Sequence, residues 1–530
     1  MRKRAIVSIA VPLLFAGVPV AAAAAGGNEV CNNGPWSGPA GVKGAVAGCT
    51  FRVSVTSSDT DPGGTSQRPR ISEDGNFVVF QSGADNLVTP YEPGHGTHVY
   101  WTRVDTAAVS IQMIDLAADG GAPNSTSTQG ATFVDVSPDG RFAAFYSTAT
   151  NLVAGKTTRL GGNLFVRDMF AAGVRTIEVP RSPSGKDVNG YSTRPTIGLA
   201  ANGMYYIAYN SKGTNLVTGA ALANEAYVTE LDPATFTVSL PKLLSHVPNQ
   251  PTSPANGTKN EHAEISSDGS AIAFQSDATN LSPKANAKTQ VYLTDNPFLA
   301  PGADPVLVSV SDTGAVANQP STRPAINRNG DEVGFQTTAD NLVPGDTNLA
   351  LDVFVRGTGP AAFIAEGHTE RVSLSYLGDQ LSGASQRINL SGDGSKVAFA
   401  ANSAQTVKGD RNKARDVTLR DLRTGKNYLI DVCVAGTTQN GGFGGMTPPC
   451  STSTATAAAS TSTASSTGSA PAGGLTSSAR AGATDLSSRA FLSDDGTRVA
   501  FISGMDDLVP NDTNDATSLD DIFVRQFNAF

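Results

Sequence analysis

Residues 323–356 read RPAINRNGDEVGFQTTADNLVPGDTNLALDVFVR and contain the main elements of a unit that recurs along the chain. A short apolar run leads to a turn that ends in Gly330, and a second apolar run, EVGFQT, follows it. Asn-Gly between β-rich runs is a strong hairpin signal, because the tight turn needs a positive φ that glycine adopts freely. The unit continues with Asn341-Leu342-Val343 and with the apolar segment DVFVR that starts at Asp352.

The turn glycine recurs seven times, at Gly75, Gly140, Gly203, Gly269, Gly330, Gly394 and Gly496. The first five intervals are 61–66 residues long, whereas the last is 102, which indicates an insertion of about 40 residues. A regular period of this length predicts a repeat architecture.

A second signature follows each glycine by eleven or twelve residues. It contains Asn86, Asn151, Asn215, Asn280 and Asn341, each followed by Leu, then Gln405-Thr406-Val407 and Asp507-Leu508-Val509. We expect the polar side chain to cap a loop through bonds to the backbone, and the Leu to fill the core beneath it.

Two more strands complete each unit, for example DVFVRG from Asp352 and RVSLS from Arg371. Four short antiparallel strands repeated seven times predict an all-β fold, a seven-bladed β-propeller of four-stranded antiparallel blades. The seventh unit ends after its third strand. Arg52-Val53-Ser54-Val55 matches Arg371-Val372-Ser373-Leu374, so we expect the N-terminal strand to close the ring within the last blade.

The N-terminus has the pattern of a secretory signal peptide over residues 1–25: three basic residues, an apolar stretch and a run of alanines. We expect an irregular segment at 26–48 and a propeller at 49–530, interrupted by a low-complexity loop at about 436–488. Removal of residues 1–25 would change the net charge from −9 to −12. The chain is therefore expected to be periplasmic or secreted, without nucleic acid as a partner, without stable membrane insertion, and monomeric.

Four cysteines suit an exported protein. They form two local pairs, Cys31 with Cys49 and Cys433 with Cys450, and each pair would staple an irregular segment. A bridge from Cys49 to Cys433, between neighbouring blades, is the alternative.

The repeat resembles the TolB-type (WD-like) propeller repeat of bacterial exported proteins. The local matches are SPDGRFAAFYS from Ser137 and NLVPGDTNLALDVFVR from Asn341, and the resemblance covers roughly residues 50–530 without the insertion. Blade three departs with AANG, and blade six lacks the Asn-Leu pair. The resemblance implies a face that binds a protein or another ligand and implies no single activity.

A ring of side chains is expected near the channel mouth, seven residues before each glycine and nine in blade three. It comprises Arg68, Phe133, Arg194, His262, Arg323, Arg387 and Arg489. Five arginines around one channel could bind a carboxylate, a sulfate or an acidic peptide end. The alternative is a structural role, in which each Arg pairs with an Asp between blades or caps a neighbouring loop.

A second constellation has hard oxygen ligands at alternating positions. Its members are Asp346, Asn348 and Asp352, with the equivalent Asp410, Asn412 and Asp416 in the next blade. Such a pattern suits Ca²⁺, although Asx turns at the start of a strand explain the same residues. No other cofactor is expected.

Linear enzyme motifs, such as G-x-S-x-G, H-E-x-x-H and the phosphate-binding loop, are absent. The leading hypothesis is an exported, non-catalytic binding or scaffold propeller that recognises a protein or cell-envelope ligand. The alternatives are a polysaccharide-active lyase or glycosidase with its site at the channel mouth, and a structural surface protein stabilised by Ca²⁺.

Overall fold

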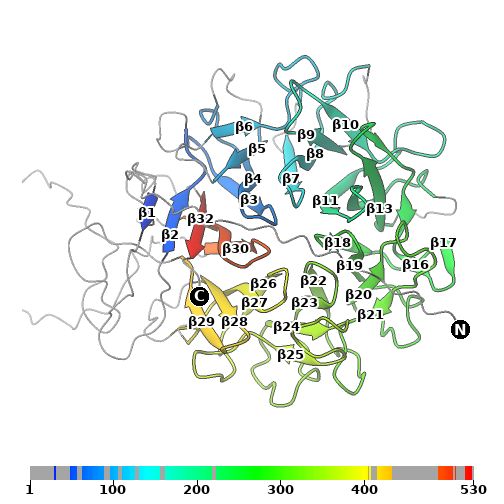
Figure 1. Ribbon diagram of the computed structural model, residues 1–530. Helices are drawn as coiled ribbons and strands as arrows, with labels where there is room; N and C mark the ends of the chain where they lie inside the picture. The colour runs from blue at the N-terminus through cyan, green and yellow to red at the C-terminus, as the bar shows by residue number, and fades with distance from the viewer. Residues whose placement is uncertain are drawn as a thin grey trace, which may run out of the picture.

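A computed structural model describes residues 29–31, 48–56, 62–88, 96–104, 110–125, 130–155, 162–217, 223–403, 405–407, 415–431, 487–504, 508 and 520–527. Every regular element in these ranges is a β-strand. The strands form seven blade sheets arranged radially around one axis, and one separate two-stranded sheet (Figure 1). The predicted all-β, seven-bladed propeller is therefore confirmed. The predicted signal peptide and residues 436–486 of the predicted insertion lie outside the described residues.

Each blade is an antiparallel sheet whose strands follow one another outward from the axis. Blade one has β3 (Ser66–Ile71), β4 (Phe77–Ser82), β5 (His98–Arg103) and β6 (Ser110–Met113); blade two has β7 (Ala131–Val136), β8 (Phe142–Ser147), β9 (Asn163–Asp168) and β10 (Thr176–Val179). Blade three has β11 (Ser192–Leu199), β12 (Tyr205–Ser211) and β13 (Glu225–Asp232), with an outer edge divided into β14 (Thr237–Val238) and β15 (Lys242–Leu243).

The later blades repeat this order after a small hairpin of β16 (His246–Val247) and β17 (Gln250–Pro254). Blade four has β18 (Glu261–Ile265), β19 (Ala271–Ser276), β20 (Gln290–Asp295) and β21 (Val306–Leu307); blade five has β22 (Ser321–Ile326), β23 (Glu332–Thr337), β24 (Asp352–Gly357) and β25 (Thr369–Arg371). Blade six has β26 (Ser385–Leu390), β27 (Lys396–Ala401), β28 (Asp416–Asp421) and β29 (Lys426–Leu429).

Blade seven combines the two ends of the chain, as predicted. It contains β30 (Ser487–Leu492), β31 (Arg498–Ser503), β32 (Asp521–Phe527) and the N-terminal β2 (Gly48–Arg52), with β1 (Glu29–Cys31) added as a fifth strand. The closing strand was predicted at 52–55, but β2 ends at Arg52. The reason is that Ser54 turns its hydroxyl back onto the neighbouring strand and accepts a 2.9 Å hydrogen bond from the N–H of Ile522.

The fifth strand was not expected, because residues 26–48 were predicted to be irregular. Its register places Cys31 directly opposite Cys49, and Cys49 is disulfide-bonded. The Cys31–Cys49 bridge remains a prediction that this register suits. Cys433 and Cys450 lie outside the described residues.

The hairpin turns form as the sequence predicted. In blade two the hydroxyl of Ser137 donates to Asp139 (2.6 Å) and accepts from the N–H of Phe142 (2.9 Å), while Gly140 has a φ of +74°. The serine and aspartate of the S-x-DG motif thus stabilise a turn that the glycine makes sterically accessible.

The hydrophobic core lies between neighbouring blades. Phe77 and Trp101 of blade one pack with Val134 and Phe145 of blade two in one cluster. The indole of Trp101 stacks on Phe77 at 5.0 Å and donates a 3.0 Å hydrogen bond to the carbonyl of Gly140 in the next blade. Because each blade covers one face of the next, no blade can bury its core alone.

Two faces of the ring can now be defined. The turn face carries the glycine turns between first and second strands, and the loop face carries the connections from second to third strands and from one blade to the next. On the loop face, Asn341 accepts from the N–H of Asn318 (3.0 Å) and donates to the carbonyl of Val316 (2.8 Å), while Leu342 is buried. The predicted loop cap and core plug are both present.

On the turn face, a belt of backbone hydrogen bonds joins the turns of neighbouring blades. Asp494 donates to Glu73 at 2.9 Å, and Gly392 donates to Asp494 at 2.8 Å. Equivalent bonds run from Glu73 to Pro138, Leu199 to Ser267, Asp268 to Arg328 and Arg328 to Gly392. Six of the seven blade junctions are therefore tied at this end.

Candidate functional site

The predicted ring of side chains coincides with seven β-bulges. The register of every innermost strand shifts at this point, for example between Thr322 and Ala325. The bulge residues are Arg68, Phe133, Arg194, His262, Arg323, Arg387 and Arg489, and their φ angles lie between 51° and 60°. A positive φ is uncommon outside glycine, so its presence at all seven equivalent positions shows that the bulge is a regular part of the channel wall.

The preceding blade holds several bulges in place. The N–H of Arg323 donates to the side-chain oxygen of Gln275 at 2.9 Å, and His262 donates to Asn210 in the same way. Arg387 donates to Gln336, also at 2.9 Å. These bonds use the backbone of the bulge residue, so any side chain can occupy the position.

The bulge lies near the loop-face end of each first strand, where the predicted ring was placed. The charges of the arginines act on one another there. Burial lowers the pKa of Arg489 to about 8, and repulsion from Arg387, Arg68 and Arg323 contributes. Burial also lowers the pKa of Arg68 to about 10, with Arg194 as the next cause. Within the described residues, the main causes of these two shifts include no carboxylate, whereas Glu261 and Glu264 oppose the lowering of the pKa of Arg194.

Among the residues that the structure describes, the guanidinium groups of Arg68, Arg194, Arg323 and Arg489 take part in no ion pair or hydrogen bond. Arg68 and Arg194 instead lie over the ring of Phe133, at 4.2 and 4.7 Å from its centroid. The expected structural alternative, an Asp partner for each Arg, is not what these four side chains show.

His262 is the sixth polar member of the ring. Both of its ring nitrogens are buried without a hydrogen-bond partner in the structure. Burial and the neighbouring Arg194 and Arg323 lower its pKa to about 2. The imidazole is therefore neutral and offers one donor and one acceptor.

A cavity of about 450 Å³, open solvent included, lies inside this ring. Its basic lining comprises Arg68, Arg194 and Arg489, together with Arg70, which is paired with the one carboxylate of the lining, Glu264. Phe133 and His262 also line it. Arg323 and Arg387 do not line it, although both lower the pKa of Arg68 and Arg489. The structure thus brings three of the five predicted arginines into one cavity. The other two, Arg323 and Arg387, lie outside it but close enough for their charges to act on Arg68 and Arg489.

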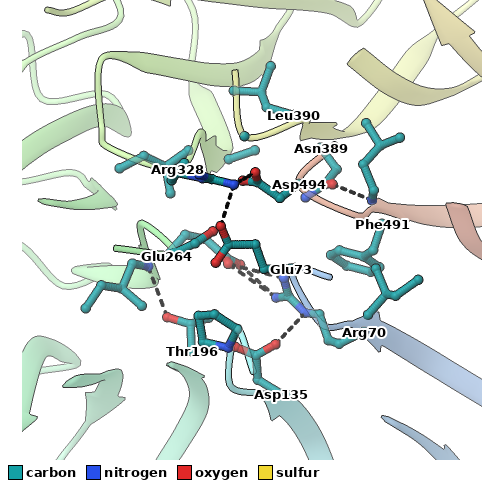
Figure 2. Close-up of a pocket in the computed structure, with 18 of the residues that line it drawn as sticks. Arg70, Glu73, Asp135, Thr196, Glu264, Arg328, Asn389, Leu390, Phe491 and Asp494 are labelled. Atoms are coloured by element: carbon teal, nitrogen blue, oxygen red, sulfur yellow. Dashed lines mark hydrogen bonds and ion pairs between the residues drawn. The ribbon is translucent and has the colours of Figure 1, made fainter. Parts of the chain in front are cut away.

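A layer of ion pairs lies farther along the channel and was not predicted. Arg70 binds Glu264 through three hydrogen bonds: 3.0 Å from Nη2 to Oε1, and 3.3 Å from each of Nη1 and Nη2 to Oε2. Its Nε lies 3.7 Å from Asp135 (Figure 2). Burial lowers the pKa of Arg70, but the two carboxylates outweigh it and the net pKa is raised. Burial raises the pKa of Asp135 to about 6.

A second set of ion pairs lies nearer the turn face. Arg328 of blade five contacts Glu73 of blade one at 2.6 Å and also pairs with Asp494 of blade seven (Figure 2). The only sequence signal for these layers is position: Arg70, Asp135 and Glu264 each stand two residues after a ring residue.

The predicted calcium ligands of blade five lie together, but their oxygens already have partners. Asp346 accepts from the amide of Gln380 (2.8 Å) and pairs with Arg371 (3.3 Å). Asn348 turns its amide nitrogen, a donor, toward Asp352 at 3.0 Å. Burial raises the pKa of both aspartates.

Asp352 also belongs to a contact that recurs between third and fourth strands. Ser373 donates to Asp352 (2.7 Å) and accepts from the N–H of Val353 (3.1 Å). The same arrangement joins Ser245 to Glu225 and Ser309 to Gln290.

Asp416 starts the third strand of blade six at the position equivalent to Asp352, whereas Asp410 and Asn412 lie outside the described residues. In the described part of the chain, no three His, Cys, Asp or Glu side chains are grouped as a metal site. The same residues contain no helix with the length and apolarity needed to cross a membrane.

No protein-family model matches the sequence, and no curated protein matches it. Among solved structures, the oligogalacturonate lyase of Vibrio parahaemolyticus is 11% identical and has a TM-score of 0.46, with 95% of this chain and 98% of the lyase covered. TolB of Acinetobacter baumannii is 13% identical with a TM-score of 0.32, covering 68% of this chain and 77% of TolB.

The acylaminoacyl peptidase of Pyrococcus horikoshii is 11% identical with a TM-score of 0.37, covering 69% of this chain and 46% of the peptidase. TolB proteins are therefore among the solved propellers that the chain is similar to, whereas no family model confirms the predicted TolB-type repeat. These similarities concern the fold alone, because one fold carries many functions.

Proposed function

We propose that this protein is an exported, non-catalytic binding propeller that holds an anionic group of its ligand in the arginine-lined cavity at the loop face. The observation that carries the proposal is an excess of positive charge: the guanidinium groups of Arg68, Arg194 and Arg489 line one cavity, and none has a direct ion pair within the described residues. Glu261 and Glu264 act on Arg194 only at longer range, and burial lowers its pKa despite them.

The repeat itself does not require these charges. Phe133 and His262 occupy the same bulge position with the same positive φ, so the bulge needs only a backbone N–H at this place. Five arginines at a position that tolerates Phe and His favour a role for the charge itself.

Physical chemistry favours an anion as the ligand of these arginines. A partly buried cation without a counter-ion is costly, and arginine keeps its proton under ordinary conditions. Guanidinium groups bind carboxylate, sulfate and phosphate oxygens through paired N–H donors. Phe133 between Arg68 and Arg194 restricts both side chains before a ligand arrives, which lowers the entropy lost on binding.

The test is a titration of the purified protein with sulfate, citrate and pyrophosphate at low ionic strength, measured by calorimetry. Binding is expected in the wild type and at least tenfold weaker binding in Arg194→Gln and Arg489→Gln. The control is Arg423→Gln, which removes a charge from a side chain that is 52% exposed and paired with Asp393. No binding by the wild type, or equal binding by all four proteins, would refute the proposal.

A further inference from the structure

The Arg70 side chain crosses the channel. It starts on the innermost strand of blade one and reaches Glu264 on the innermost strand of blade four, with Asp135 of blade two at its side. The guanidinium also lies 4.2 Å from the centroid of Phe491 in blade seven. Four blades therefore converge on one cation at the axis (Figure 2).

This cluster lies between two cavities. Arg70, Thr196, Glu264 and Phe491 line both the basic cavity and a second one of about 800 Å³, open solvent included, on the turn-face side. These shared residues therefore lie where the two cavities meet. A chain passing from one cavity to the other would have to pass the Arg70–Glu264 pair, which three hydrogen bonds hold together.

The cavity beyond this pair has the opposite charge balance. It is lined by four carboxylates, Glu73, Asp135, Glu264 and Asp494, against the two guanidinium groups of Arg70 and Arg328. An anionic chain is attracted to the basic cavity and repelled by the acidic one. The belt of hydrogen-bonded turns surrounds this end of the channel, and Arg328 pairs there with Glu73 and Asp494.

A ligand group with one negative charge would not balance the positive charge of the basic cavity. Three unpaired guanidinium groups line it, and Arg323 and Arg387 add repulsion from outside its wall. A group with two or more charges offsets more of this repulsion than a single carboxylate. His262 adds one neutral donor and one acceptor, which suit a protonated or bridging oxygen of such a group.

We propose that the basic cavity is a blind pocket for the terminal, multiply charged oxyanion group of the ligand, which enters from the loop face and stops at the Arg70–Glu264 pair. This inference rests on the proposed function, because it assumes that the cavity binds an anion. It adds that the group is an end of its molecule and that it carries at least two charges.

Long-chain polyphosphate is a suitable probe, since it has two ends and many identical internal charges. We expect two protein molecules per chain at saturation, whatever the chain length, as measured by sedimentation. Conversion of both ends to phosphoramidates of a bulky amine should weaken binding at least tenfold. A stoichiometry that grows with chain length, or equal binding of the capped polymer, would overturn end-on recognition.

The charge requirement is tested with small anions. Pyrophosphate and citrate are expected to bind at least tenfold more tightly than acetate. The ratio of the affinities for pyrophosphate and citrate distinguishes a preference for phosphate from a preference for carboxylate end groups. Equal affinities for acetate and pyrophosphate would overturn the requirement for multiple charges. If no anion binds at all, the proposed function itself fails, whereas binding without preference for ends or charge refutes only this inference.

Discussion

The hydroxyl of Ser54 donates a 2.6 Å hydrogen bond to Oδ1 of Asp521, although 467 residues separate them in the chain. The same hydroxyl accepts from the N–H of Ile522 at 2.9 Å. Ser373 makes the equivalent pair of bonds to Asp352 and Val353 in blade five, where its partners are only about 20 residues away. One local motif thus serves as a strand contact in one blade and as the closure of the ring in another.

This pair gives a matched test of ring closure. Ser54→Ala and Ser373→Ala should each cost about 1–2 kcal/mol of unfolding free energy, because each removes the same two hydrogen bonds and leaves a buried carboxylate short of a donor. Only Ser54→Ala should also make the N-terminal strand accessible to protease under native conditions. Equal protease sensitivity of the two variants would contradict a special role for Ser54 in closure.

Replacing a ring arginine by a neutral residue should stabilise the folded protein. Arg489→Gln should raise the melting temperature at low ionic strength, by the equivalent of about 1 kcal/mol, because it removes a cation that burial and its neighbours destabilise. The gain should vanish in concentrated pyrophosphate if, as we propose, the wild type binds this anion through Arg489. Arg423→Gln, with a paired and exposed side chain, serves as the control and should not gain stability under either condition. A lower melting temperature of Arg489→Gln at low salt would count against an unbalanced ring.

The buried carboxyl group of Glu225 should make the stability of the protein depend on pH. Burial raises its pKa to about 7 from an ordinary value of 4.5, while hydrogen bonds from Ser245 and Asn260 oppose the shift. The folded state therefore holds the proton more tightly than the unfolded state, so the contribution of Glu225 to stability is greatest below pH 4.5 and is lost as the pH rises through about 7.

Glu225→Gln should remove this loss. The equivalent position in blade four is Gln290, whose side chain accepts the same hydrogen bond from Ser309 at 2.5 Å. We expect the variant to match the wild type in melting temperature at pH 5 and to exceed it at pH 8, by the equivalent of about 1 kcal/mol. If the wild type is as stable at pH 8 as at pH 5, and the variant has the same stability as the wild type, burial does not destabilise the charged form of Glu225.

The parts of the fold that the sequence predicted are those that depend on repetition. The third strands begin where the repeat places them, at His98, Asn163, Gln290 and Asp352. The match of Arg52 to Arg371 was also right, since β2 and β25 both end at these arginines. The predicted extension of β2 to Val55 was wrong because the serine two residues later bonds back to the third strand, which a hydropathy pattern does not reveal.

The candidate site could be predicted only in part, because only some of its residues recur from blade to blade. Ring residues recur at a fixed distance from the turn, so their convergence follows from the fold. The wall of the cavity does not recur: the residues two positions later are Arg70, Asp135, Thr196, Glu264, Ala325, Asn389 and Phe491. The Arg70–Glu264 pair joins blades one and four, and which members of such a varied set meet across the axis depends on the folded structure.

The calcium hypothesis can be decided at blade five. Chelator should leave the melting temperature unchanged, because Gln380 and Arg371 already bind Asp346 and the amide nitrogen of Asn348 faces Asp352. Asp346→Asn should instead destabilise the protein by about 1–3 kcal/mol, since it leaves the largely buried Arg371 without its carboxylate. Scanning calorimetry with and without chelator, on both proteins, distinguishes the two cases. A chelator effect that is present in the wild type and lost in Asp346→Asn would establish a calcium site here and replace the ion pair as the explanation of these residues.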